Sequence, residues 1–132
     1  MNQTTKKILV VEDDKRVTAA LAIRLESAGY EVLTAPNGFE GLKLALGERP
    51  DLLLMDIWMP AGIGFSVAQR LQDLGLTGIP IIFITGSKLA GLHDTARKLG
   101  ATAFFEKPYD PEQLLAAISQ ALESRTATAG KS

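Results

Sequence analysis

The sequence predicts an α/β protein with a doubly wound, five-stranded parallel sheet and helices on both faces. Short apolar runs alternate along the chain with segments in which apolar residues recur at helical spacing, and this alternation occurs five times. The runs Leu52–Met55 and Ile81–Ile84 are apolar without interruption, which is typical of strands that helices cover on both sides. Five such strands favour the flavodoxin-like order 2-1-3-4-5, joined by right-handed crossovers.

Length, charge and composition restrict the class of protein. The chain has 132 residues, 46% of them hydrophobic, and a net charge of -1 at pH 7, which suits one globular domain with its own core. Lysine and arginine are scattered along the chain, so we expect no direct binding of nucleic acid. Cysteine is absent, which excludes disulfides, thiolate metal sites and cysteine nucleophiles.

Hydropathy argues against a membrane protein. No apolar run approaches the roughly 20 residues of a membrane span. The first five residues are polar and lack the apolar segment of a signal peptide. We therefore expect a cytoplasmic protein.

The same patterns give the order of the elements. We expect strands over residues 8–11, 31–35, 52–56, 81–85 and 102–105. We expect helices that begin at Asp14 and at Asn37, helices over residues 65–74 and 87–99, and a last helix from Pro111 to Glu123. The second of these helices has an apolar side made of Phe39, Leu42, Ala45 and Leu46.

Capping residues and glycines set the expected helix ends. The Asp14 carboxylate is expected to cap the first helix rather than to bind a metal, and Gly29 ends that helix. Gly47 is expected to close the second helix. Asp110 and Pro111 together are a strong signal for the start of the last helix. Gly91 costs its helix about 1 kcal/mol relative to alanine, so we expect the fourth helix to be the least stable.

The chain divides into three parts. Residues 1–5 form a polar N-terminal arm, and residues 6–123 carry all the predicted strands and helices. Residues 124–132 are small and polar and have no core-facing pattern, so we expect a flexible tail or a truncated linker.

Polar residues occur where the predicted strands end. Glu12 and Asp13 follow the first strand, Asp56 ends the third, Thr85 ends the fourth and Lys107 follows the fifth. Because the carboxyl ends of parallel strands share one edge of the sheet, we expect these side chains to lie close together. Three crowded carboxylates repel one another and favour a bound cation. Oxygen ligands without histidine or cysteine indicate Mg²⁺.

This set of residue types suits a site that handles a phosphoryl group. The metal would neutralise phosphoryl oxygens, Lys107 would pair with another oxygen, and Thr85 would donate a hydrogen bond to a third. Asp56 would remain free to attack the phosphorus.

Four motifs in this order resemble the receiver domain of bacterial two-component response regulators, of the chemotaxis-type single-domain kind. The motifs are Ile8–Asp14, Asp56–Pro60 with Gly64, Ile84–Gly86 and Glu106–Pro108. The resemblance covers about residues 6 to 123. It implies a signalling protein, not an enzyme, that catalyses only its own phosphorylation and dephosphorylation.

The resemblance also implies roles for individual residues. Asp56 would accept the phosphoryl group from the phosphohistidine of a sensor histidine kinase or a phosphotransfer protein. Four groups would hold Mg²⁺: Glu12, Asp13, Asp56 and the backbone carbonyl of Trp58. Thr85 and Lys107 would bind the phosphoryl group, Thr85 and Phe104 would form the switch, and the Lys107–Pro108 peptide bond would be cis. A downstream partner, or a second copy of the chain, would bind the face made by the fourth helix, the fifth strand and the fifth helix.

Two other functions remain open. A degenerate receiver would only dock partners, but such a module has no need for the complete set of acids, threonine and lysine. A small phosphatase of the haloacid-dehalogenase type also uses an aspartate nucleophile with Mg²⁺. That family resembles receivers in chemistry, but it has an Asp-x-Asp pattern after its first strand and a longer chain, whereas this sequence reads Glu12-Asp13-Asp14.

Overall fold

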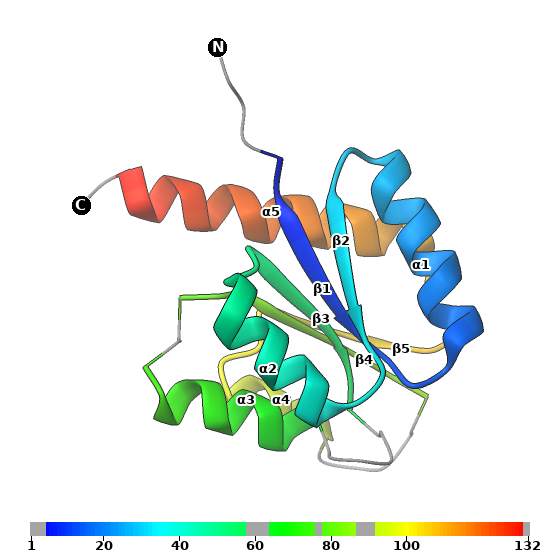
Figure 1. The fold of residues 1–132 in the computed structure, drawn as a ribbon. Helices are drawn as coiled ribbons and strands as arrows, with labels where there is room; N and C mark the ends of the chain where they lie inside the picture. Colours follow the sequence, from blue (N-terminus) through cyan, green and yellow to red (C-terminus); the bar gives the residue numbers. More distant parts are fainter. Residues whose placement is uncertain (1–4, 58–63, 76–77, 87–91, 131–132) are drawn as a thin grey trace.

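The computed structural model of the chain describes residues 5–57, 64–75, 78–86 and 92–130. Strands and helices alternate within these ranges (Figure 1): β1 (Lys7–Val11), α1 (Lys15–Ser27), β2 (Glu31–Ala35), α2 (Gly38–Glu48), β3 (Leu52–Asp56), α3 (Gly64–Asp73), β4 (Ile81–Thr85), α4 (Leu92–Lys98), β5 (Ala103–Glu106) and α5 (Pro111–Gly130).

The sheet has the predicted topology. Its strand order is β2-β1-β3-β4-β5 and every neighbouring pair is parallel. Val11 of β1 pairs with Met55 of β3, so the residues that follow these two central strands emerge side by side. The strand order reverses between β1 and β3, which is where ligands bind in open sheets of this kind.

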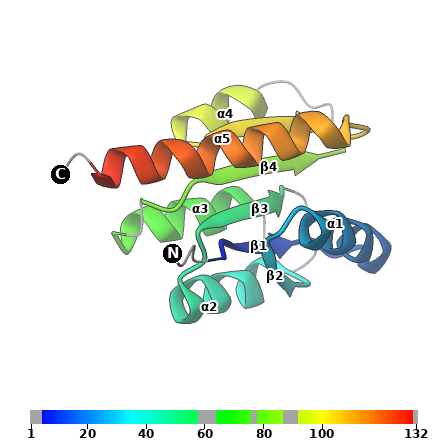
Figure 2. The ribbon, with the colours of Figure 1, turned by 90° about the horizontal axis from the view of Figure 1, so that it is seen from above.

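The sheet separates two hydrophobic cores. One face packs against α1 and α5, through residues such as Leu25 and Ile118, and we call it the α1/α5 face. The other packs against α2, α3 and α4, through residues such as Leu71 and Ala96, and we call it the α2–α4 face. Figure 1 shows the two groups of helices on opposite sides of the strands, and in Figure 2 α1 and α5 lie toward the viewer. The central strands β3 and β4 are buried along their whole length, as their uninterrupted apolar runs predict.

The helix caps follow the sequence with one correction. Asp14 caps α1, because its Oδ1 accepts the backbone N–H of Arg16 at 2.9 Å. The Asn37 side chain caps α2 in the same way. The expected end of α2 at Gly47 is wrong: the helix continues to Glu48 and ends at Arg49, which has φ 50°. Pro50 explains this end, since a proline disfavours helical backbone at the residue before it.

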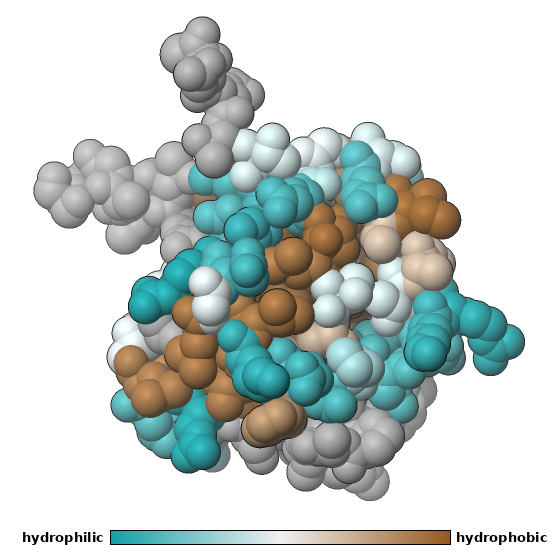
Figure 3. Space-filling model, viewed as in Figure 1, coloured by the Kyte–Doolittle hydropathy of each residue, from teal (hydrophilic) through white to brown (hydrophobic). Residues whose placement is uncertain are grey.

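The expected apolar side of α2 is also only partly correct. Ala45 is buried, but Phe39 is 63% exposed and Leu46 is 39% exposed. Leu42 is partly buried and packs against the core, as expected. The fully buried positions are small, and Gly38 and Gly41 among them let the helix approach β1 closely. Figure 3 shows hydrophobic residues at the surface in the region of α2, interspersed with polar ones.

The last helix is longer than expected, and the fourth is described only in part. α5 continues beyond Glu123 to Gly130, and in Figures 1 and 2 its C-terminal end extends past the sheet. The sequence after Glu123 contains no residue that stops a helix before Gly130, and alanine favours the helical state. α4 is described over Leu92–Lys98, and the expected residues 87–91, with Gly91, lie outside the described part. Among the described helices, none is long and apolar enough to cross a membrane.

The contact between α2 and β1 generates a prediction about stability. A Cβ atom on Gly41 would lie 2.8 Å from Val11 Cγ2, whereas a Cβ on Gly47 would meet no atom within 4 Å. We expect Gly41→Ala to lower the free energy of unfolding by about 1–3 kcal/mol because the core is overpacked. Gly47→Ala should raise it by about 0.5–1 kcal/mol, because alanine loses less backbone entropy in a helix. Urea unfolding followed by circular dichroism measures both, and stabilisation by both variants would contradict the close approach.

Candidate functional site

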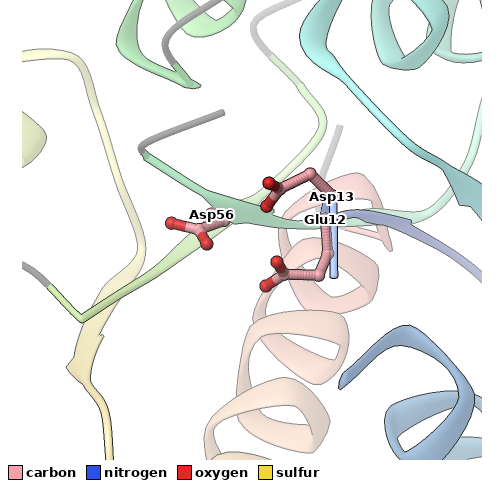
Figure 4. Close-up of side chains that lie close together, drawn as sticks. All are labelled: Glu12, Asp13 and Asp56. Carbon is pink, nitrogen blue, oxygen red and sulfur yellow. The ribbon is translucent and has the colours of Figure 1, made fainter. Parts of the chain in front are cut away.

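Three carboxylates meet at the carboxyl edge of the sheet. Glu12 and Asp13 directly follow β1, and Asp56 is the last residue of β3. One carboxylate oxygen from each residue lies within 4.8 Å of the corresponding oxygens of the other two. Figure 4 shows the three side chains gathered at the ends of these strands. Glu12 and Asp56 are buried, with exposed fractions of 5% and 8%, while Asp13 is exposed to solvent.

Lys107 joins two of these acids. Its Nζ lies 3.0 Å from Glu12 Oε1 and 3.2 Å from Asp56 Oδ2, and it forms a hydrogen-bonded ion pair with each. The backbone N–H of Lys107 donates to the carbonyl of Thr85 at 2.8 Å, which fixes the residue at the end of β4. The Lys107–Pro108 peptide bond is cis, as expected. One ammonium group therefore offsets part of the repulsion between two buried carboxylates.

Burial and neighbouring charges shift the pKa values of Glu12 and Lys107. Burial raises the pKa of Glu12, and the charge of Asp56 raises it further. Hydrogen bonds from the backbone N–H of Asp14, at 3.1 Å, and from Lys107 act in the opposite direction. Burial alone would lower the pKa of Lys107, but its hydrogen bond to Glu12 and the charge of Asp56 outweigh that effect and raise it. Lys107 therefore stays charged at neutral pH.

Thr85 and Phe104 lie toward the other face of the sheet. Thr85 is fully buried at the end of β4, and alternation along the strand puts it on the same side as Phe83, in the α2–α4 face. Phe104 pairs in register with Phe83 and packs against the same core. Asp56 alternates with Met55 and so projects toward the α1/α5 face. The backbone of Trp58, the remaining expected metal ligand, lies outside the described residues.

A groove next to the acids is a feature that the sequence analysis did not identify. A cavity of about 600 Å³ runs between α1 and the connection from β5 to α5. Arg16, Arg24 and Lys107 line it together with Asp14, apolar residues and the ring of Tyr109. Arg16, Ala20 and Arg24 recur every four residues and so share one side of α1. That spacing is visible in the sequence, but charged residues on the exposed side of a helix do not by themselves indicate a groove.

The Lys107 ion pairs generate a prediction about the dependence of stability on pH. In metal-free buffer, we expect Lys107→Met to lower the free energy of unfolding by about 1–3 kcal/mol, because two buried carboxylates lose their cation. Because the pKa of Glu12 is raised in the folded state, a protonated Glu12 favours folding. This contribution to stability is complete below the unfolded-state pKa and is lost as the pH rises through the folded-state pKa. Removing Lys107 raises that pKa further, so the stability difference from the parent should be larger at pH 7.5 than at pH 5.

Urea unfolding at the two pH values measures this difference. Lys43→Met is the matched control, because the Lys43–Glu40 pair is exposed and 3.9 Å apart, and its loss should change stability by less than about 1 kcal/mol at either pH. A stability loss from Lys107→Met that is equal at both pH values would contradict the assigned electrostatics.

Comparison with known proteins agrees with this fold and geometry. Residues 8–119 match the family described as the response regulator receiver domain. Protein PilH of Pseudomonas aeruginosa is 37% identical over 117 residues, which cover 88% of this chain and 97% of that protein. The transcriptional regulator RpaA of Synechocystis is 37% identical over 123 residues, which cover 91% of this chain and 50% of that protein. The chain thus spans about half the length of RpaA and of several other curated relatives.

Solved structures give the same result. A CheY-like receiver domain protein from Methanospirillum hungatei superposes with a TM-score of 0.90 at 30% identity, over 95% of this chain and 99% of that one. The chemotaxis protein CheY4 of Vibrio cholerae superposes with a TM-score of 0.82 at 29% identity, over 89% of this chain and 99% of that one. With its sheet order, its edge of acids and a family match over residues 8–119, the chain belongs to the response regulator receiver domain family of two-component systems.

Proposed function

We propose that this chain is a phosphorylation-dependent signalling switch in which Asp56 accepts a phosphoryl group. The observation that carries the proposal is the contact of one lysine ammonium with Asp56 and Glu12 inside a cluster of three acids. A buried carboxylate beside a fixed cation is suited to attack phosphorus, because the cation can bind the charge that the transfer brings to the site. The donor is the phosphohistidine of a sensor histidine kinase or of a phosphotransfer protein.

The transfer exchanges one bond to phosphorus for another. An Asp56 oxygen forms the new O–P bond, and the P–N bond of the donor breaks, with its electron pair leaving on the imidazole nitrogen. The acyl phosphate carries about 1.5 to 2 negative charges, in place of the single charge of the attacking carboxylate. Lys107 Nζ, already 3.2 Å from Asp56 Oδ2, binds a phosphoryl oxygen there. The chain catalyses no reaction other than its own phosphorylation and the later hydrolysis.

The acid cluster suits Mg²⁺. Its donors are all carboxylate oxygens, which magnesium prefers, and the exposed Asp13 gives a cation access from solvent. Glu12, Asp13 and Asp56 would hold the ion together with the carbonyl of Trp58. When bound, Mg²⁺ supplies positive charge that offsets the phosphoryl oxygens.

The donor protein would dock in the groove between α1 and the β5–α5 connection. Lys107 belongs both to the wall of this groove and to the acid cluster, so a side chain that enters the groove approaches Asp56. Arg16 pairs with Asp14, but Arg16, Arg24 and Lys107 together leave positive charge beside apolar surface, which suits an amphipathic helix that carries acids.

The output would leave from the opposite face. Thr85 is the neutral group expected to turn toward the phosphoryl oxygens, and Phe104 would fill the space that it vacates. Both residues belong to the α2–α4 face, and Phe104 is in β5, so the change reaches the surface of α4, β5 and α5. A downstream partner or a second copy of the chain would bind there in one of the two states.

Phosphorylation at Asp56 can be tested with a small phosphodonor. Acetyl phosphate with Mg²⁺ should add one phosphoryl group to the chain, at Asp56, which ends β3 within the acid cluster and contacts Lys107. Intact-mass measurement should show this addition in the parent and not in Asp56→Asn. The control Asp73→Asn, which changes an exposed acid of α3, should be modified like the parent. Incorporation that persists in Asp56→Asn would exclude Asp56 as the acceptor, and no incorporation in the parent would favour a receiver that only docks partners.

The role of the acids can be tested by thermal unfolding with Mg²⁺. Millimolar Mg²⁺ should raise the Tm of the parent, because a cation that binds only the folded state stabilises it. Asp13→Asn should lose this response, since Asp13 belongs to the cluster. Asp14→Asn should keep it, because Asp14 caps α1 and asparagine caps a helix equally well. An equal response in all three proteins would leave Asp13 without a metal role.

A further inference from the structure

A side-chain hydrogen bond links α3 to Leu99, the residue that follows α4. Gln72 Nε2, on α3, donates to the backbone carbonyl of Leu99 at 2.6 Å, across 27 residues of sequence. Gln72 follows Leu71, and α3 is fixed to the core by Val67, Ala68 and Leu71, all of which are buried. Gln72 therefore extends from a well-anchored helix to its neighbour.

The end of α4 that receives this bond has a defined geometry. Gly100 has φ +82°, its N–H donates to Arg97 O at 3.0 Å, and the N–H of Ala101 donates to Ala96 O at 3.0 Å. This pair of bonds is a Schellman motif, which ends the helix rigidly. The carbonyl of Leu99 accepts neither bond, and it belongs to the last turn, where carbonyls have no partner within the helix. Gln72 supplies that partner. Because the Schellman motif joins Leu99 to the last turn of α4, the bond restrains the position of that whole turn.

The linked helix end lies in the core that the switch would disturb. Ala96 is buried, and Leu99 and Phe104 pack against the same hydrophobic cluster. Thr85 is on the same face of the sheet. A change in the packing of Phe104 would therefore be felt at the end of α4, and the bond from Gln72 would oppose a displacement of that end relative to α3.

We propose that Gln72 is a latch that holds α4 in its unphosphorylated position. The inference rests on the proposed function, because it requires two states that differ at α4. In the unphosphorylated state the bond is made, and in the phosphorylated state it is broken. A bond present in one state only shifts the equilibrium by its own net free energy. Its loss therefore favours the phosphorylated arrangement.

Binding of beryllofluoride, a mimic of the phosphoryl group, with Mg²⁺ tests the latch. Gln72→Leu keeps an apolar stem on α3 but removes the donor, and it should bind beryllofluoride about two- to tenfold more tightly than the parent. Gln72→Glu, which keeps the length and also lacks the donor, should shift the affinity in the same direction. Without beryllofluoride, hydrogen exchange over residues 92–101 should be faster in both variants than in the parent.

Gln69→Leu is the matched control. Gln69 is one turn earlier on α3, and its amide donates to Asp73 of the same helix at 3.1 Å, at the surface. Its removal should leave both the affinity and the exchange rates at the parent values. An unchanged or weaker affinity of both Gln72 variants would overturn the latch while leaving phosphorylation intact. Failure of the parent itself to bind beryllofluoride would overturn the proposed function and the latch with it.

Discussion

The contact of Lys107 with Glu12 and Asp56 is the interaction on which the site depends. It connects residues at the carboxyl ends of three strands, so it forms only when the ends of β1, β3 and β5 are correctly aligned. Burying two carboxylates near each other is unfavourable unless a cation accompanies them. The lysine lowers this cost, and Asp13 adds a third carboxylate that is exposed to solvent. One ammonium group thus pairs with two of the acids, and the three carboxylates still outnumber it.

The elements whose function is packing were largely predictable from the sequence. β3 and β4 match their apolar runs because a strand buried on both faces tolerates little else. The acids and Lys107 were predictable as neighbours because parallel strands end at one edge. The end of α2 was not predictable in this way. Gly47 is a strong local signal for a helix end, but the helix ends two residues later, at Arg49, where Pro50 restricts the backbone. The burial expected for Phe39 is wrong because α2 contacts β1 through Gly41, and glycine does not count as apolar in a helical pattern of large hydrophobic residues.

Features that depend on distant pairs were the least predictable. Nothing near Gln72 in the sequence indicates that it reaches Leu99, because that contact follows from how α3 and α4 pack on the sheet. The groove beside α1 needs the β5–α5 connection as its second wall, and the two are more than 80 residues apart. Exposed arginines on a helix are common, and Arg16 and Arg24 differ from others in that they line a groove together with Lys107.

The division into two cores has a consequence for how such a protein can change during evolution. The groove, Glu12 and Asp56 lie with the α1/α5 face, whereas Thr85, Phe104 and the bond from Gln72 lie with the α2–α4 face. Substitutions on opposite sides of the sheet share few neighbours, so their effects on free energy should be nearly additive. If the groove receives the donor and the α2–α4 core carries the response, as proposed, a substitution in one of them would alter donor recognition or the response with little effect on the other. The sheet would then keep the two kinds of specificity separate during evolution.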